Sequence, residues 1–146
     1  MEILKGIPVC PGVAIAEAFV LDAESFVIPE RFIQPERAEH EVEKFNNAIR
    51  AAVDEIKQIT EKLVGGVGYE YAPIFQAHVQ ILEDKSFVDG VIYNIRNHRY
   101  SAEYAVSRAL RKFAKAFLDM EDEYLSQRVS DVYDIEKRLL RILIGR

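Results

Sequence analysis

The sequence predicts a mainly helical protein, built as a four-helix bundle with a kinked second helix and preceded by a short β segment. From about residue 34 onward, apolar residues recur at alternating spacings of four and three, which is the pattern of amphipathic helices. Turn and cap residues divide this region into four units with short connections, which favours a mostly antiparallel bundle. Residues 1–28 are instead rich in Val, Ile, Ala and Pro. We therefore expect two parts, residues 1–28 and residues 29–146.

Composition excludes several classes of function. The 146 residues are 49% apolar and 29% charged, which fits one globular domain with a small appendage. The net charge of −5 and the lack of a basic cluster disfavour nucleic acid and suit a basic protein partner. The single cysteine, Cys10, excludes a disulfide framework and fits a reducing cytoplasm. No apolar run approaches the roughly 20 residues of a membrane span, and the first residues lack the pattern of a signal peptide. We expect a cytoplasmic protein without membrane insertion.

The N-terminal segment is predicted to contain short strands near residues 2–6 and 13–21. The turn elements Ile7-Pro8 and Pro11-Gly12 separate these two stretches.

The first helix is predicted to begin near Pro35, which suits a first helical turn and is followed by Glu36 and Glu39 near the positive end of the dipole. Its apolar residues form a bundle seam, and Gly65-Gly66-Val67-Gly68 ends it. The seam consists of Ala38, Val42, Phe45, Ile49, Ala52, Ile56, Ile59 and Leu63.

The second bundle member is predicted to be two helices joined at a kink. The first covers about residues 70–83, and Asp84 is placed to act as the N-cap of a third segment over residues 85–97. Ser101 is the expected N-cap of the next helix, with Glu103 in its first turn. Two apolar stripes follow, one in this helix and one in the last: Val106, Leu110, Phe113, Phe117 and Met120, then Leu125, Val129, Val132, Ile135, Leu139 and Ile142.

The segment Ile74 to Asp84 carries more apolar surface than one core can use. Phe75, Val79 and Leu82 form one stripe, and Ile74, His78 and Ile81 form a second, rotated by one residue's step. A lone histidine in an apolar stripe is usually a satisfied core residue. Because the Phe75 stripe already supplies the core contacts, we expect the second stripe to face outward and dock a protein partner.

No set of residues suggests catalysis. A di-iron bundle needs Glu-x-x-His motifs, and none occurs. His40-Glu41 lacks the second histidine of a zinc-protease motif, and the glycine run after the first helix lacks the Lys-Ser/Thr of a phosphate loop. Cys10 has no His or Asp close to it in sequence. Arg128 is interpreted either as a solvated charge or as an anchor for a partner. The residues alone indicate a binding module, without catalytic or metal-ligating groups.

Four collinear stretches of the sequence form recognisable motifs. They are Gly6 to Ala16, the helix Ile74 to Asp84 with its Ile-Phe-x-x-His-x-x-x-Leu-Glu-Asp pattern, Ala102-Glu103-Tyr104-Ala105-Val106, and the run from Asp122-Glu123-Tyr124-Leu125 to Lys137-Arg138-Leu139-Leu140. Together they resemble Enzyme I of the phosphoenolpyruvate:sugar phosphotransferase system.

The resemblance implies that residues 1–28 begin an α/β phosphohistidine domain and that the helical bundle binds the carrier protein HPr. It also implies that the parent enzyme is a homodimer that uses phosphoenolpyruvate and magnesium to phosphorylate a histidine and passes the phosphoryl group to HPr for sugar uptake. The acceptor histidine of the family lies in a Gly-Gly-x-Thr-Ser-His motif that this sequence lacks. We therefore expect His40, His78 and His98 not to be the acceptor, and the chain to be an inactive part of the enzyme without its own cofactor.

The resemblance also implies a docking face, which maps onto Ile74, His78, Ile81, Glu83, Asp84, Phe87, Tyr124, Leu125 and Arg128. Acidic residues surround this face in many members, but Tyr69, Tyr71, Lys85 and Ser86 stand at such positions here. Two alternatives remain open: a non-catalytic helical adaptor or homodimerising bundle that uses the same face, and a paralogue that serves nitrogen regulation.

Overall fold

The computed structural model describes Gly12 and residues 28–64, 72–119 and 128–145. The strands predicted near residues 2–6 and 13–21 lie outside these residues, as does the glycine run after the first helix. Among the described residues, none of the helices combines the length and the apolar character needed to cross a membrane.

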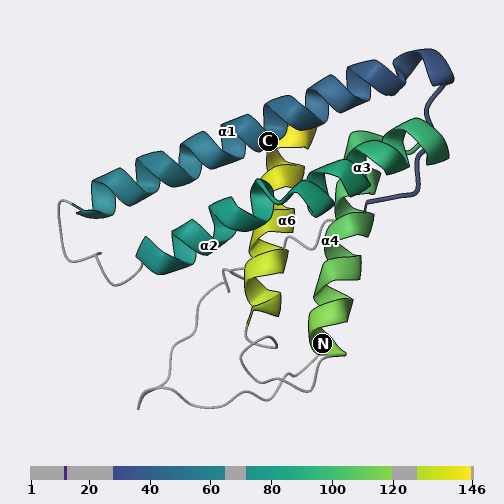
Figure 1. Ribbon diagram of the computed structural model, residues 1–146. Coiled ribbons are helices and arrows are strands. Elements are labelled where there is room, and N and C mark those ends of the chain that lie inside the picture. The colour runs from purple at the N-terminus through teal and green to yellow at the C-terminus, as the bar shows by residue number, and fades with distance from the viewer. Residues whose placement is uncertain (1–11, 13–27, 65–71, 120–127, 146) are drawn as a thin grey trace.

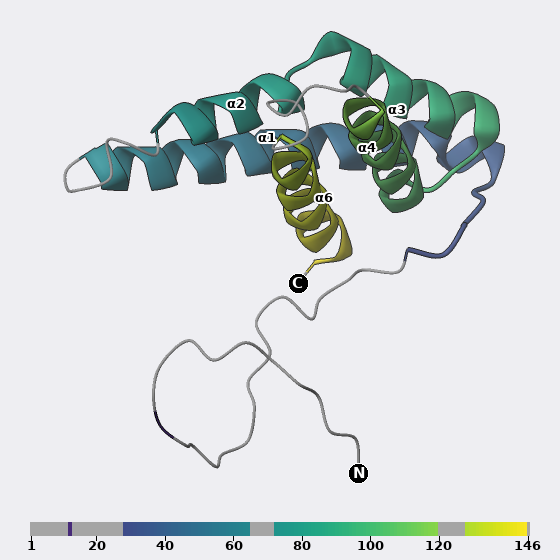
Figure 2. The same cartoon turned by 90° about the horizontal axis from the view of Figure 1, so that it is seen from below.

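The described chain is a bundle of two layers, and the helices within each layer are antiparallel. A 3₁₀ turn (Pro35–Arg37) leads into α1 (Ala38–Val64), and α2 (Ala72–Leu82) and α3 (Lys85–His98) run back along it. The second layer is α4 (Ala102–Leu118) and α6 (Val129–Ile144), which are antiparallel to each other and lie across the first layer. Figure 2 shows from below how α2 and α3 follow one side of α1. The predicted helical bundle with a kinked second member is confirmed.

The kink between α2 and α3 has a local cause. The backbone of Asp84 is extended, with φ −62° and ψ 122°, so the helix of α2 cannot continue through it. Its carboxylate accepts a hydrogen bond from the backbone N–H of Phe87 at 2.9 Å and thereby caps α3. The predicted N-cap is confirmed, and it redirects the chain while leaving the first turn of α3 hydrogen-bonded.

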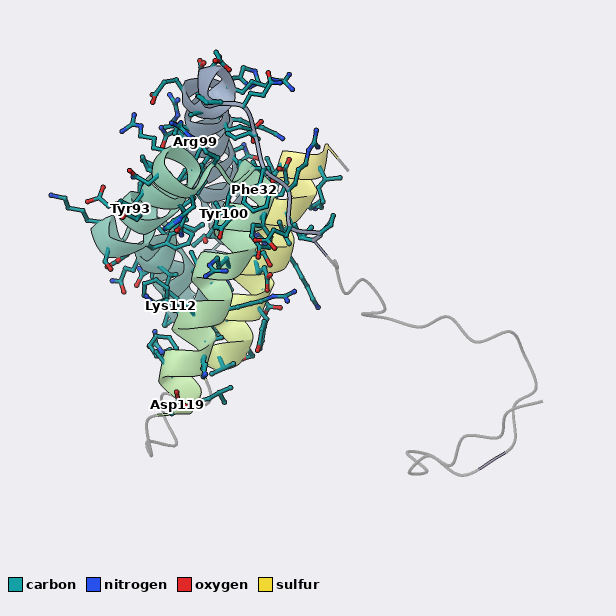
Figure 3. All side chains as sticks on the ribbon, turned by 90° about the vertical axis from the view of Figure 1, so that its right-hand side faces the viewer. Phe32, Tyr93, Arg99, Tyr100, Lys112 and Asp119 are labelled. Carbon is teal, nitrogen blue, oxygen red and sulfur yellow. The ribbon has the colours of Figure 1, made fainter. Side chains whose placement is uncertain are left out.

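The turn between α3 and α4 is tied to the segment that enters α1. Arg99 adopts the left-handed conformation, with φ 58°, and ends α3. Its carbonyl accepts a hydrogen bond from the N–H of Ile33 at 2.7 Å, and Phe32 and Tyr100 form an antiparallel bridge. Figure 3 shows Phe32 and Tyr100 next to each other below Arg99. Ser101 then caps α4, as predicted. These contacts fix the start of α1 against the α3–α4 turn.

The core lies between the two layers and contains most of the predicted seams. Phe45 and Phe87 are fully buried and their rings meet edge to face at 6.1 Å, while Phe113 contacts Phe87 in the same way at 6.2 Å. The seam of α1 from Ala38 to Ile59 is buried or half-buried as expected, and so is that of α6 from Val129 to Ile142. Leu63 and Leu125 lie outside the residues whose side chains the structure describes. The fully buried large side chains also include Ile56, Leu82, Ile95, Leu110, Ile135, Leu139 and Leu140.

Polar contacts join α6 to its neighbours inside this apolar framework. Glu136 is 7% exposed, and its carboxylate accepts hydrogen bonds from the Ser107 hydroxyl at 2.6 Å and from Arg111 Nε at 3.3 Å. Both donors come from α4. A buried carboxylate is tolerated only when it is hydrogen-bonded in this way, so the pair also fixes the register of α4 against α6.

Candidate protein-docking surface

His78 and Asp131 mark the point at which α2 meets α6. The Nε2 atom of His78 lies 3.4 Å from an Oδ atom of Asp131, and the histidine is only 6% exposed. The prediction that His78 faces outward is therefore wrong. The reason is tertiary: α6 crosses α2 at this residue and covers the face that the helical pattern alone left free. Its Nε2 has no hydrogen-bond partner among the described residues.

The other members of the two predicted stripes divide differently. Leu82 is completely buried and Ile74 is 46% exposed, both as expected. Ile81 is half-buried and packs against the core, so it is less exposed than a fully outward residue. Phe75 and Val79 are also only half-buried, while Ala77 is buried. The buried face of α2 is therefore centred between the two stripes, because both α1 and α6 contact the helix.

Phe87 is not part of an exposed face. Only 1% of it is accessible, and it sits between the rings of Phe45 and Phe113. The prediction of Phe87 as a partner contact is therefore wrong for this structure. The bend at Asp84 changes the helix direction, so the exposed face of α2 does not continue through this position.

The remaining predicted residues surround the α2–α6 junction on its bend side. Ile81 lies one helical turn after His78, and half-buried Arg128 lies one turn before Asp131. On one side of the His78–Asp131 contact, Ile74, which precedes His78 in α2, and Asp134, which follows Asp131 in α6, line a common groove. The residues that follow His78 and those that precede Asp131 are therefore on the other side. Ile81 and Arg128 thus lie on the same side of the junction. Tyr124 and Leu125 lie outside the described residues.

The charge on this side of the junction comes mainly from carboxylates. Glu83 and Asp84 are exposed in the bend, and Asp131 is partly exposed on α6. Lys85 is the adjacent exposed cation. We call the group of Ile81, Glu83, Asp84, Arg128 and Asp131 the bend surface. A partly apolar centre with acidic neighbours is suited to a partner that offers apolar and basic side chains.

Asp131 is the member of this surface that the sequence-based site missed. It could have been found from its position three residues after Arg128, in the first turn of the last helix, where the two side chains share a face. Its contact with His78 depends on how α6 crosses α2, which local sequence does not specify.

The three histidines lie apart in the described part of the chain. His40 and His98 are exposed on separate helices, and His78 is buried. Within residues 28–64, 72–119 and 128–145, no three His, Cys, Asp or Glu side chains come together as a possible metal site.

Comparison with known proteins agrees with this fold. The family model described as "PEP-utilising enzyme, N-terminal" matches residues 5–128. The phosphoenolpyruvate-protein phosphotransferase of Haemophilus influenzae is 32% identical over 142 residues, which is 97% of this chain and 25% of that protein. The Bacillus subtilis protein of the same name is 32% identical over 145 residues, or 99% of this chain and 25% of its own length. The chain thus spans about a quarter of the length of these relatives.

Solved structures show the same architecture. A solution structure of Enzyme I (nEIt) aligns with a TM-score of 0.77 at 31% identity, covering 84% of this chain and 49% of that one. The "N-terminal domain of Enzyme 1 - Nitrogen" aligns with a TM-score of 0.75 at 24% identity, covering 82% and 49%, and supports the fold alone. The family match covers most of the sequence, and the helical fold is that of Enzyme I N-terminal domains. The chain therefore belongs to the family of PEP-utilising enzymes and corresponds to the N-terminal region of those enzymes.

Proposed function

We propose that this chain is the HPr-binding helical part of a phosphoenolpyruvate-protein phosphotransferase. The relatives that match nearly its whole length carry that enzyme's name. The observation that carries the proposal further is the bend surface, which places half-buried Ile81 and Arg128 and exposed Glu83 and Asp84 on one side of the His78–Asp131 contact. Such a surface can dock a small carrier protein through an apolar centre and a charged rim.

The histidines of this chain are not suited to phosphoryl transfer in the proposed enzyme. Phosphoryl transfer needs an acceptor, a donor site and groups that position both. The chain's three histidines are separated in the fold and lack such surroundings among the described residues. We propose that none of them accepts a phosphoryl group. The parent enzyme, a cytoplasmic homodimer, would take the group from phosphoenolpyruvate with magnesium and pass it through its own histidine to HPr for sugar uptake.

Isothermal titration with the HPr of the same organism tests the proposal. Wild-type chain should bind with a stoichiometry of one, and Ile81→Ala should weaken binding by about tenfold, a typical effect for an interface anchor. Ile92→Ala is the matched control, because Ile92 is also half-buried and packed against the core but lies on α3, away from α6. It should bind HPr as the wild type does.

Two outcomes would count against the proposal. Absence of binding by a folded chain would remove HPr as the partner, and a concentration-dependent dimer in sedimentation would then favour the homodimerising bundle. Equal weakening by Ile81→Ala and Ile92→Ala would show that binding does not use the bend surface.

A further inference from the structure

A groove lies on the other side of the His78–Asp131 contact from the bend surface. It has a volume of about 790 Å³ and is bounded by the C-terminal half of α1, by α2 and by α6. Glu55, Gln58, Ile59 and Lys62 line it from α1 at the spacing of one helix face. Asp134, Lys137, Arg138 and Arg141 line it from α6 at the same spacing. One continuous face of α1 and one continuous face of α6 therefore line the same groove.

The groove is positive although the chain as a whole is acidic. Among the described residues that line it, Lys62, Lys137, Arg138 and Arg141 face two carboxylates, Glu55 and Asp134, so in this set cations outnumber anions by two. The net charge of the chain is −5. A local excess of this sign in an acidic protein attracts anions to one place on the surface.

The two arginines of the groove share one carboxylate. Glu55 Oε2 accepts from Arg138 at 3.0 Å and from Arg141 at 2.6 Å. A single carboxylate neutralises only one guanidinium charge. The Arg141 side chain is 48% exposed, so its remaining donors are accessible to an oxyanion.

The wall opposite the arginines is apolar and comes from α2. Ile74 is 46% exposed and Phe75 is half-buried, and both line the groove with His78. The ring of Phe75 meets the ring of His78 edge to face at 6.4 Å. His78 closes this wall where α2 meets α6, and its buried Nε2 lies 3.4 Å from Asp131 with no hydrogen-bond partner among the described residues.

We propose that this groove binds a small organic anion, with a phosphate or carboxylate group on Arg138 and Arg141 and an apolar part against Ile74 and Phe75. The volume falls in the range of small-molecule sites, roughly 300–1,000 Å³. Guanidinium pairs bind phosphate and carboxylate through paired N–H donors. The site is independent of HPr docking, because the groove and the bend surface lie on opposite sides of the His78–Asp131 contact.

Nuclear magnetic resonance titration of the whole ¹⁵N-labelled chain tests this proposal. The probes are phenyl phosphate, benzoate and inorganic phosphate, each compared with sodium chloride at equal ionic strength. Phenyl phosphate and benzoate separate the phosphate from the carboxylate as the source of the anionic group. We expect saturable shifts of the amides near Arg138 and Arg141 and of the His78 ring, with inorganic phosphate binding at least about threefold more weakly than phenyl phosphate.

Arg141→Gln tests the basic wall while Glu55 keeps its contact with Arg138. It should weaken phenyl phosphate binding by at least about threefold. Lys57→Gln removes the same charge from an exposed position of α1 that does not line the groove, and it should change binding by less than about twofold.

Several results would overturn the proposal. They are the absence of saturation by about 20 mM probe, equal shifts with sodium chloride, and equal effects of Arg141→Gln and Lys57→Gln. Binding of a hexaglutamate peptide by a chain that ignores the three small anions would also refute it, because the groove would then serve an acidic polypeptide.

Discussion

Truncating Leu82 and Ile81 separately distinguishes the buried side of α2 from the side that we propose docks a partner. Leu82 is completely buried at the end of α2, where the helix meets the bend. Ile81 is its neighbour in sequence but is only half-buried. We expect Leu82→Ala to destabilise the fold strongly and Ile81→Ala to destabilise it weakly.

The size of the effect follows from burial. Leu82→Ala removes three carbon atoms from a side chain with no exposed surface, which loses about 2–3 kcal/mol of transfer free energy before any cavity is counted. With the cavity included, a loss of about 3–5 kcal/mol is expected. For a protein of this size, that corresponds to a fall in Tm of roughly 6–20 °C. Ile81→Ala should cost about 1 kcal/mol, because part of its side chain already faces solvent.

Urea unfolding followed by circular dichroism measures both free energies of unfolding under the same conditions, with thermal melts as a second readout. The m values should stay unchanged, so that a shift in midpoint reports stability alone. If Ile81→Ala proved as destabilising as Leu82→Ala, or more so, the distinction between the two faces of α2 would be refuted.

Three further predictions concern stability away from the bend surface. Ser107→Ala should lower the free energy of unfolding by about 1–3 kcal/mol in urea melts, because buried Glu136 then loses its 2.6 Å hydrogen bond; an unchanged midpoint would contradict this. Gly90→Ala should raise the free energy of unfolding by about 1 kcal/mol and raise Tm with it, because Gly90 lies inside α3 and an added Cβ would meet no atom within 4 Å. A lower Tm would contradict this prediction. Burial is the largest single influence on the pKa of Glu103 and raises it, but hydrogen bonds from Lys44, the backbone and Ser101, together with the charge of Lys44, outweigh burial and leave the pKa below its ordinary value. A lowered carboxylate pKa gives stability that is lost as pH falls, so between about pH 5 and pH 3 wild type should lose more Tm than Lys44→Gln, and parallel curves would refute the coupling.

The sequence predicted the helices well, because their signals are local. The seam from Ala38 to Ile59 follows the helical repeat and lies in the core, apart from its two half-buried isoleucines. Asp84 and Ser101 cap helices for a reason that involves only the next three residues. Such features do not depend on how distant elements meet.

The candidate site was predicted only in part, because it depends on how helices cross. His78 is buried by α6, more than fifty residues later in the chain, and no periodicity within α2 shows this. Phe87 was assigned to the surface across a bend that turns its side chain into the core. The groove beside Arg138 is composed of residues from three helices and has no signature in any of them.

The most direct test of HPr docking is to map the bound surface on the ¹⁵N-labelled chain with unlabelled HPr. We predict that amide shifts and line broadening concentrate around Ile81, Glu83 and Asp84 and in the first turn of α6, from Arg128 to Asp131, with little change in the second half of α4. Uniform small changes, or changes centred on the groove between α1 and the C-terminal half of α6, would contradict docking through the bend surface.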